Sequence, residues 1–204
     1  MDHLTASDVA ALIQRRDRAF KRLISDVGPP PRQRSGPVDQ RFAALVRSIT
    51  FQLLATKAAE TIHGRVVTVC GGDVSVERVL HVGPDGLRTA GLSGTKASAM
   101  VELAEGVASG RIALHRHGRL ADHEVIREVS TVRGIGSWTV QMYLMFTLAR
   151  PDVWPSGDYG VRNGWSKLHG LDEIVSEPTL RDAGEAFVGV RSAVAWYCWR
   201  AVEG

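Results

Sequence analysis

Apolar residues recur with helical spacing along most of the chain. Phe42, Leu45, Val46, Ile49 and Leu53 stand at i, i+3, i+4, i+7 and i+11, which places them on one face of a helix. The same spacing predicts further helices, marked by Val9, Leu12 and Phe20; Ala58, Ala59 and Ile62; Met100, Leu103, Ala104 and Val107; Val125, Ile126 and Val129; Val140, Tyr143, Leu144 and Leu148; and Val190, Ala193, Val194, Tyr197 and Ala201. Only Val66–Val69 has the composition of a strand, and it is too isolated to build a sheet. The pattern predicts an all-α protein.

Helix-capping and helix-breaking residues divide this pattern. Four of the eight prolines fall in the Gly/Pro/Arg/Ser-rich stretch 29–37, which is typical of a linker. Ser7 and Asp122 are expected to be N-caps and Gly110 a C-cap, because short polar side chains and glycine favour those positions.

Composition narrows the classes of protein that remain. The net charge of +3 on 204 residues permits a nucleic-acid partner without requiring one. Cys70 and Cys198 are the two cysteines, too few for a four-cysteine zinc or iron–sulfur site. No run approaches 18 apolar residues and the chain opens on a charged amphipathic stretch, so we expect no membrane span and no secretory signal. A reducing, cytoplasmic setting follows as the expectation.

A Gly-x-Gly turn joins two of the predicted helices. Gly134 and Gly136 lie between a helix that ends near Ser130 and one that begins near Ser137, and both glycines can adopt positive φ. The free N–H groups from about Gly136 to Thr139 would then form an anion site suited to a backbone phosphate. The three residues by themselves fit an ordinary helix–turn–helix corner equally well.

A carboxylate follows the turn at a second helix start. Pro155–Ser156–Gly157–Asp158 begins nineteen residues after Gly136 and precedes a helical stretch over 159–168. Aspartate at this place is a good N-cap. The helix N-terminus and Arg162, one turn later, both favour the ionised carboxylate.

The turn and the Pro-Ser-Gly-Asp segment, taken together, resemble the helix–hairpin–helix–Gly/Pro–Asp superfamily of base-excision DNA glycosylases. Within it the chain is most similar to the 3-methyladenine DNA glycosylase II family. Further fragments in the same order support the resemblance, which covers about residues 39–202: Gln52–Leu54 with Lys57–Ala59, Gly91–Ser93 with Lys96, and Arg191–Ser192 with Trp196 and Trp199.

The resemblance implies two helical subdomains. One spans 38–150 and contains the helix–hairpin–helix. The other combines 1–37 with 151–204 and carries Asp158 at the junction. A cleft for DNA and for a flipped base is expected between them.

The implied activity is monofunctional base excision. Trp138 stands where bifunctional members of the superfamily carry a lysine, so the enzyme is expected to release 3-methyladenine-type alkylated purines by hydrolysis and to leave an abasic site. No cofactor and no iron–sulfur cluster are implied. The expected partner is double-stranded DNA with damaged bases, bound by a monomer close to the chromosome. Two alternatives stay open: excision of uracil, mismatched thymine or an oxidised purine, and a non-catalytic helix–hairpin–helix DNA-binding protein.

The resemblance also assigns roles to single residues. Asp158 would stabilise the oxocarbenium-like sugar and orient the attacking water. Leu53, with Gln52 beside it and Leu54 as substitute, would fill the gap that the flipped nucleotide leaves, although Leu53 also continues a core-facing stripe. The base pocket would be lined by Trp138, Met142, Tyr143, Tyr159 and Phe187.

Some positions depart from the family pattern. The family often has an aromatic residue where this chain has Met142, and Trp and Pro where it has Phe187 and Gly189. These differences leave the base preference open.

The hairpin is the expected phosphate-binding element. Its residues are Arg133, Gly134, Ile135, Gly136, Ser137 and Thr139. The resemblance implies a monovalent cation under the turn, held by the backbone carbonyls of Ser130, Val132 and Ile135. Arg133 and Lys96 are either phosphate contacts or solvated surface charges.

Overall fold

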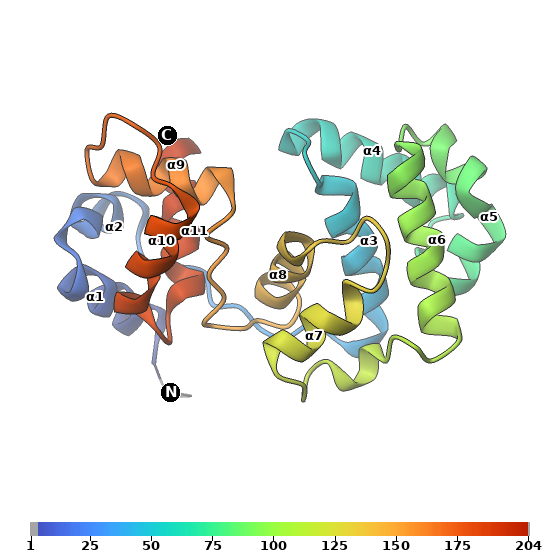
Figure 1. Ribbon diagram of the computed structural model, residues 1–204, viewed down its shortest axis with the longest axis horizontal. Helices are drawn as coiled ribbons and strands as arrows, with labels where there is room; N and C mark the ends of the chain where they lie inside the picture. Colours follow the sequence, from blue (N-terminus) through green and yellow to red (C-terminus); the bar gives the residue numbers. More distant parts are fainter. Residues whose placement is uncertain (1–3, 204) are drawn as a thin grey trace. The chain divides into compact units, whose positions relative to one another are not determined.

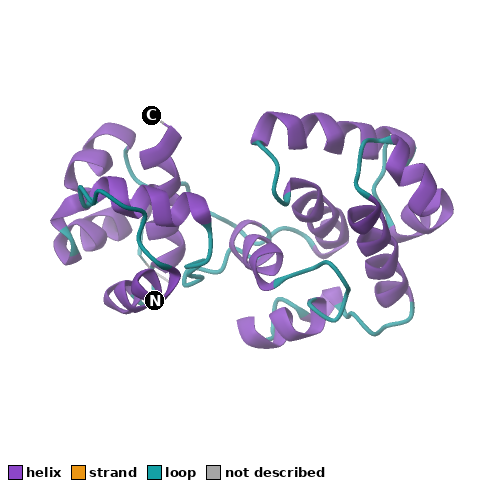
Figure 2. Cartoon of the chain, turned by 45° about the horizontal axis from the view of Figure 1, so that its top comes forward, coloured by secondary structure: helices purple, strands orange, loops and turns teal. Residues whose placement is uncertain are grey.

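The computed structural model describes residues 4–203, and every regular element in that range is helical (Figure 2). The all-α prediction is therefore confirmed. The chain forms two compact units, which divide between Arg34 and Ser35 and between Leu148 and Ala149. These divisions lie within three residues of the predicted boundaries at 37/38 and 150/151.

The middle unit, residues 35–148, contains six α-helices (Figure 1). They are α3 (Arg41–Phe51), α4 (Thr56–Val69), α5 (Val76–Thr89), α6 (Gly94–Ala108), α7 (Asp122–Val129) and α8 (Ser137–Phe146), with the short 3-10 turns η2 (Val38–Gln40) and η3 (Leu114–Arg116). Helix α3 packs against α4, α6 and α8. Its Leu45, Val46 and Ile49 are fully buried, as the spacing predicts.

The terminal unit combines the N-terminal segment with residues 149–203. Its elements are α1 (Ala6–Arg16), η1 (Arg18–Phe20), α2 (Lys21–Val27), α9 (Tyr159–Leu168), α10 (Glu177–Ala183), η4 (Gly184–Phe187) and α11 (Arg191–Glu203). Phe20 is fully buried and makes edge-to-face contacts with Trp165, Phe187 and Tyr197. Such aromatic clusters bury a large apolar area, and this one joins η1 to α9, η4 and α11.

Two of the sequence-based assignments are wrong in secondary structure. Val66–Val69 is the last turn of α4 and not a strand. Val66 is buried together with Ala59, two turns earlier, so packing of one helix face overrides the strand preference of the valines. The first predicted helix does not reach Phe20, because Asp17 breaks it with an extended φ of −147° and caps η1 instead.

The caps agree in part with the prediction. Gly110 follows the C-cap Ser109 of α6 with φ +76°, as expected of a terminating glycine. The N-cap of α1 is Thr5 and not Ser7. Asp122 is the first residue of α7, after the N-cap Ala121, whose N–H is bound by the Glu124 carboxylate at 2.8 Å.

The spacing misses α2, α5 and α10. Helix α5 is bent at Gly83, with φ +65°, directly before Pro84, which interrupts its periodicity. Among the described helices, none combines the length and apolar character needed to cross a bilayer.

Helices α9 and α11 lie very close together at Gly164. A Cβ atom at this position would lie 1.9 Å from the carbonyl oxygen of Cys198, far inside van der Waals contact. Only a glycine therefore allows α11 to lie where it does.

We expect Gly164→Ala to lower the free energy of unfolding by about 1–3 kcal/mol, the usual cost of overpacking, as measured by urea denaturation. Gly64→Ala is the matched control, since Gly64 is an exposed mid-helix glycine with nothing within 4 Å of its would-be Cβ. That control should be neutral or stabilising. Equal effects of the two substitutions would contradict the close helix contact.

Candidate active site

The turn between α7 and α8 has the conformation of a tight hairpin. Helix α7 ends at its C-cap Ser130, and α8 begins after its N-cap Gly136. Gly134 has φ +91° and so uses the positive φ that a glycine allows. Gly136 is extended, with φ −88° and ψ 171°, and does not use the positive φ that a glycine allows. It serves as an N-cap that lacks a side chain.

The N–H groups at this turn are only partly available. Those of Gly134, Gly136 and Ser137 donate to no other described residue, and all three residues are exposed. The N–H of Thr139 donates to the Gly136 carbonyl at 3.1 Å, and that of Ile135 to the Val132 carbonyl at 3.1 Å. Exposed donors at a helix N-terminus are suited to an anion, but Thr139 contributes no free amide here.

The hairpin rests on helix α6. A Cβ atom at Gly134 would lie 3.4 Å from Thr95 Cγ2 and 3.5 Å from Ala99 Cβ. The N–H of Arg133 donates to the Glu102 carboxylate at 3.2 Å. Arg133 therefore connects the turn to α6 through its backbone N–H, while its side chain is exposed.

A buried histidine joins the two helices that flank the hairpin. The ring of His117 is fully buried, with Nε2 3.1 Å from Glu128 Oε1 on α7 and Nδ1 3.2 Å from the Tyr143 hydroxyl on α8. Glu128 Oε1 also accepts the Ala113 N–H at 2.6 Å. Burial lowers the pKa of His117, an effect that exceeds the opposing one of the Glu128 hydrogen bond.

The loop after α3 presents a fully exposed leucine. Leu53 has a relative exposure of 102%, so its alternative assignment to the core is wrong. Its φ of +54° is left-handed, which costs a non-glycine residue about 1–2 kcal/mol. An apolar side chain held in solvent in a costly conformation fits the wedge that the sequence predicts. Leu54 beside it is partly exposed, at 38%.

Gln52 does not share this exposed position. Its Nε2 donates to the Gly134 carbonyl at 3.1 Å and to Thr139 Oγ1 at 2.7 Å. The expectation that Gln52 accompanies Leu53 as part of the wedge stays a prediction. The side chain is engaged with the hairpin and ties the loop to it.

Asp158 in the terminal unit is the N-cap of α9, as predicted. Its Oδ1 accepts the Val161 N–H at 2.8 Å and the indole N–H of Trp199, on α11, at 2.9 Å. The carboxylate also lies at the positive end of the α9 dipole. Arg162, expected to favour the charge, extends to the Val175 carbonyl at 3.5 Å.

Trp199 and Gly160 are functional candidates that the sequence argument did not assign. A Cβ atom at Gly160 would lie 2.9 Å from Trp199 Cδ1 and 3.1 Å from Asp158 Oδ1. Gly160 is thus required for the indole to reach the carboxylate. A glycine inside a helical pattern weakens the helix and so points to a packing reason, whereas no spacing rule connects residues 158 and 199.

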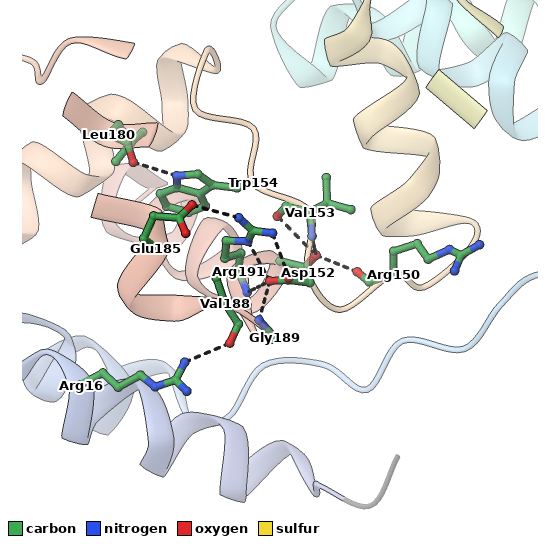
Figure 3. A network of polar contacts seen from close by, with 11 residues as sticks. Arg16, Arg150, Asp152, Val153, Trp154, Leu180, Glu185, Val188, Gly189 and Arg191 are labelled. Atoms are coloured by element: carbon green, nitrogen blue, oxygen red, sulfur yellow. Dashed lines mark hydrogen bonds and ion pairs between the residues drawn. The ribbon is translucent and has the colours of Figure 1, made fainter. Parts of the chain in front are cut away.

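The segment that leads to Asp158 is pinned to α11 and its preceding turn (Figure 3). Asp152 accepts from the Gly189 N–H at 2.6 Å and, through both carboxylate oxygens, from the Arg191 guanidinium at 2.8 and 2.9 Å. Such bidentate pairs fix geometry as well as adding energy. Ser192 Oγ accepts the Val153 N–H at 2.9 Å, and the Trp154 indole donates to the Leu180 carbonyl at 2.8 Å. These contacts therefore fix the segment that precedes Asp158.

The predicted base-pocket residues fall into two groups. Trp138 is half-buried in the first turn of α8, Met142 follows one turn later, and Tyr159 is 63% exposed next to Asp158. Tyr143 and Phe187 are buried, the first against His117 and the second against Phe20 and Trp165. These two have the contacts of core side chains within their own units, and their assignment to a base pocket stays a prediction.

These features occur together in a known class of repair proteins. The chain matches the HhH-GPD superfamily base excision DNA repair protein family over residues 46–187, and it belongs to that superfamily.

Individual relatives indicate which members of the superfamily the chain is similar to. The chain is 33% identical over 187 residues to DNA-3-methyladenine glycosylase 1 of Schizosaccharomyces pombe, with 90% of this chain and 82% of the relative covered. Among solved structures it is similar to the Schizosaccharomyces pombe 3-methyladenine DNA glycosylase in complex with abasic DNA, with a TM-score of 0.89 at 31% identity and 96% and 97% of the two chains covered. It is also similar to the DNA-3-methyladenine glycosidase of Bacillus halodurans, with a TM-score of 0.79, 32% identity and coverage of 96% and 89%.

The buried His117 makes stability depend on pH. Its pKa in the folded protein lies below the ordinary 6.5, so the unfolded chain binds more protons and the unfolding free energy falls as the pH drops below about 6.5. We expect urea denaturation between pH 7 and pH 5 to show a shallower decline for His117→Gln than for the parent. His123→Gln, at an exposed histidine of α7 that is not among the groups acting on His117, should retain the parent slope; a parent slope in His117→Gln as well would refute the assignment.

Proposed function

We propose that this protein is a monofunctional DNA glycosylase that removes alkylated purines of the 3-methyladenine type from double-stranded DNA. The observation that carries the proposal is the Asp158 carboxylate, which caps α9 and is held by the Trp199 indole in a chain of the base-excision repair superfamily. The activities named for its relatives support the choice of substrate. The protein would act as a monomer on the chromosome in the cytoplasm.

Asp158 would promote cleavage of the glycosidic bond by electrostatics. As the bond to the base breaks, the deoxyribose becomes positively charged, and a fixed carboxylate stabilises that charge and orients the attacking water. The Val161 N–H and the Trp199 indole hold Oδ1, so the carboxylate need not reorganise during the reaction. A cationic alkylated purine is already a good leaving group and needs little acid catalysis.

Aromatic faces would select the cationic base. An indole attracts a cation by about 0.5–2 kcal/mol, and Trp138 is the first candidate for that contact. Trp138 also has no amine, so it cannot form the Schiff base with the sugar that a bifunctional enzyme requires. The expected product is therefore an abasic site in an intact strand.

The hairpin would hold the DNA backbone through its amides. The exposed N–H groups of Gly134, Gly136 and Ser137 suit one phosphate, which explains how a protein with a net charge of only +3 can bind DNA. Leu53 would then fill the gap left by the flipped nucleotide, whose extrusion costs a few kcal/mol.

Mutation of the carboxylate tests the proposal most directly. We expect Asp158→Asn to bind lesion-containing duplex with nearly unchanged affinity and to lose at least about 10²-fold in single-turnover excision, because one preorganised electrostatic group contributes on that scale. Mass analysis of the bases released from randomly alkylated DNA measures the loss and gives the lesion spectrum of the parent.

The controls separate the alternatives. Asp172→Asn, at an exposed aspartate of the same unit, should keep parent activity. Release of uracil or 8-oxoguanine in preference to methylated purines would reassign the substrate. Duplex binding without release of any base would favour a non-catalytic DNA-binding protein.

We further propose that a monovalent cation lies under the hairpin, held by the carbonyls of Ser130, Val132 and Ile135. Uncharged carbonyl oxygens suit such an ion. The Val132 carbonyl accepts the Ile135 N–H but retains a second lone pair, so the donor set fits. The ion would add positive charge behind the phosphate-binding amides.

Exchange of the salt tests this site. At constant ionic strength, replacing potassium by tetramethylammonium should weaken binding to abasic duplex several-fold, because the larger ion cannot be held by the carbonyls. Fluorescence anisotropy measures the affinity. Identical affinities in the two salts would rule the cation out.

A further inference from the structure

Lys96 occupies an unusual place for a cation. It lies in the first turn of α6, where its own N–H donates to the N-cap Ser93 at 3.3 Å. The positive end of the helix dipole disfavours a cation at this position. Lys96 is therefore not placed to stabilise α6, the helix in which it lies.

Its ammonium reaches the opposite end of another helix. Nζ donates to the Thr50 carbonyl at 2.9 Å and to the Gln52 carbonyl at 2.6 Å. These oxygens lie at the C-terminus of α3, where carbonyls lack intrahelical partners and the dipole favours positive charge. Lys96 thus caps α3 from outside.

The ammonium is held without a carboxylate partner. None of the ion pairs between described residues involves Lys96, and its side chain is half-buried. This burial partly desolvates the ammonium and lowers the pKa of Lys96. A charge kept under these conditions differs from the solvated surface charge or phosphate contact expected from the sequence.

Gln52 is held from two sides. Lys96 binds its carbonyl, while its side-chain amide donates to the Gly134 carbonyl and to Thr139 Oγ1 in the hairpin region. The next residue is Leu53, exposed and left-handed. The three connections make one rigid path from α6 and the hairpin to the exposed leucine.

We propose that Lys96 is a positioning residue that, together with Gln52, locks Leu53 to the phosphate-binding hairpin, so that capture of the backbone phosphate also places the wedge. This inference deepens the proposed function and depends on it. A leucine on an untethered loop would lose its exposed conformation and would have to be ordered again on binding, and preorganisation removes that cost.

The first measurement compares excision from paired and unpaired lesions. Lys96→Met removes the ammonium and keeps the length of the side chain. It should lower the single-turnover rate on a duplex lesion about tenfold and leave the rate on a single-stranded lesion nearly unchanged, because only the duplex leaves a gap to be filled. Lys96→Arg, which can still donate to both carbonyls, should restore most of the rate.

Two further variants control for charge and for folding. Lys167→Met removes the same charge from an exposed position of the terminal unit and should leave both rates unchanged. Thermal unfolding of Lys96→Met shows whether the variant folds. If Lys96→Met does not fold, Lys96→Arg and Gln52→Ala replace it in the comparison of duplex with single-stranded lesions. Lys96→Arg should then keep a parent-like rate on duplex, and Gln52→Ala should show a reduced one.

A double-mutant cycle shows whether Lys96 acts through the wedge. Leu53→Ala should also reduce excision from duplex about tenfold. In that background the further effect of Lys96→Met should vanish, since residues that act through one another are not additive. Additive losses, or equal losses on duplex and single strand, would overturn the proposal.

Wedge insertion can be followed without chemistry. In Asp158→Asn protein, the fluorescence of a 2-aminopurine stacked beside the lesion reports opening of the duplex. Lys96→Met should reduce this signal several-fold in the same background, whereas Lys167→Met should not. If the parent protein releases no base but Lys96→Met still reduces the fluorescence signal, the proposed glycosylase activity is contradicted and the positioning role of Lys96 stands. If excision is normal and Lys96→Met has no effect, the positioning role is contradicted and the glycosylase activity stands.

Discussion

The terminal unit depends on the close approach of α9 and α11. Gly160 and Gly164 are one turn apart on α9, and each leaves room for an atom of α11 that a Cβ would displace: the Trp199 ring in one case and the Cys198 carbonyl in the other. The helix contact that packs the unit therefore also brings the Trp199 indole to Asp158. Packing and the candidate catalytic geometry follow from the same two glycines.

The middle unit has a corresponding arrangement around its hairpin. Helix α6 supports the turn at Gly134 through Thr95 and Ala99, and His117 joins α7 to α8. Lys96 extends from the same α6 to the end of α3. One helix thus supports both the hairpin and the loop that carries Leu53, although Gln52 in that loop and Gly134 in the hairpin lie 82 residues apart in the chain.

Local signals predicted much of this arrangement. The all-α fold, the left-handed Gly134 and the cap at Asp158 each follow from periodicity or from the conformational preference of one residue. The same signals failed where tertiary contacts compete with them. Val66–Val69 joins a helix because Val66 packs with Ala59, and Leu53 leaves the apolar stripe because α3 ends before it.

The sequence by itself determined that the protein is helical, where its hairpin lies and which carboxylate follows it, because these depend on neighbouring residues. Only the tertiary structure decided what holds the functional groups in place. Gln52 binds the hairpin 82 residues away, Lys96 binds α3, and Trp199 binds Asp158 across 41 residues. Such contacts depend on how helices pack, and a hydrophobic pattern records which face of a helix is buried but not which partner it meets.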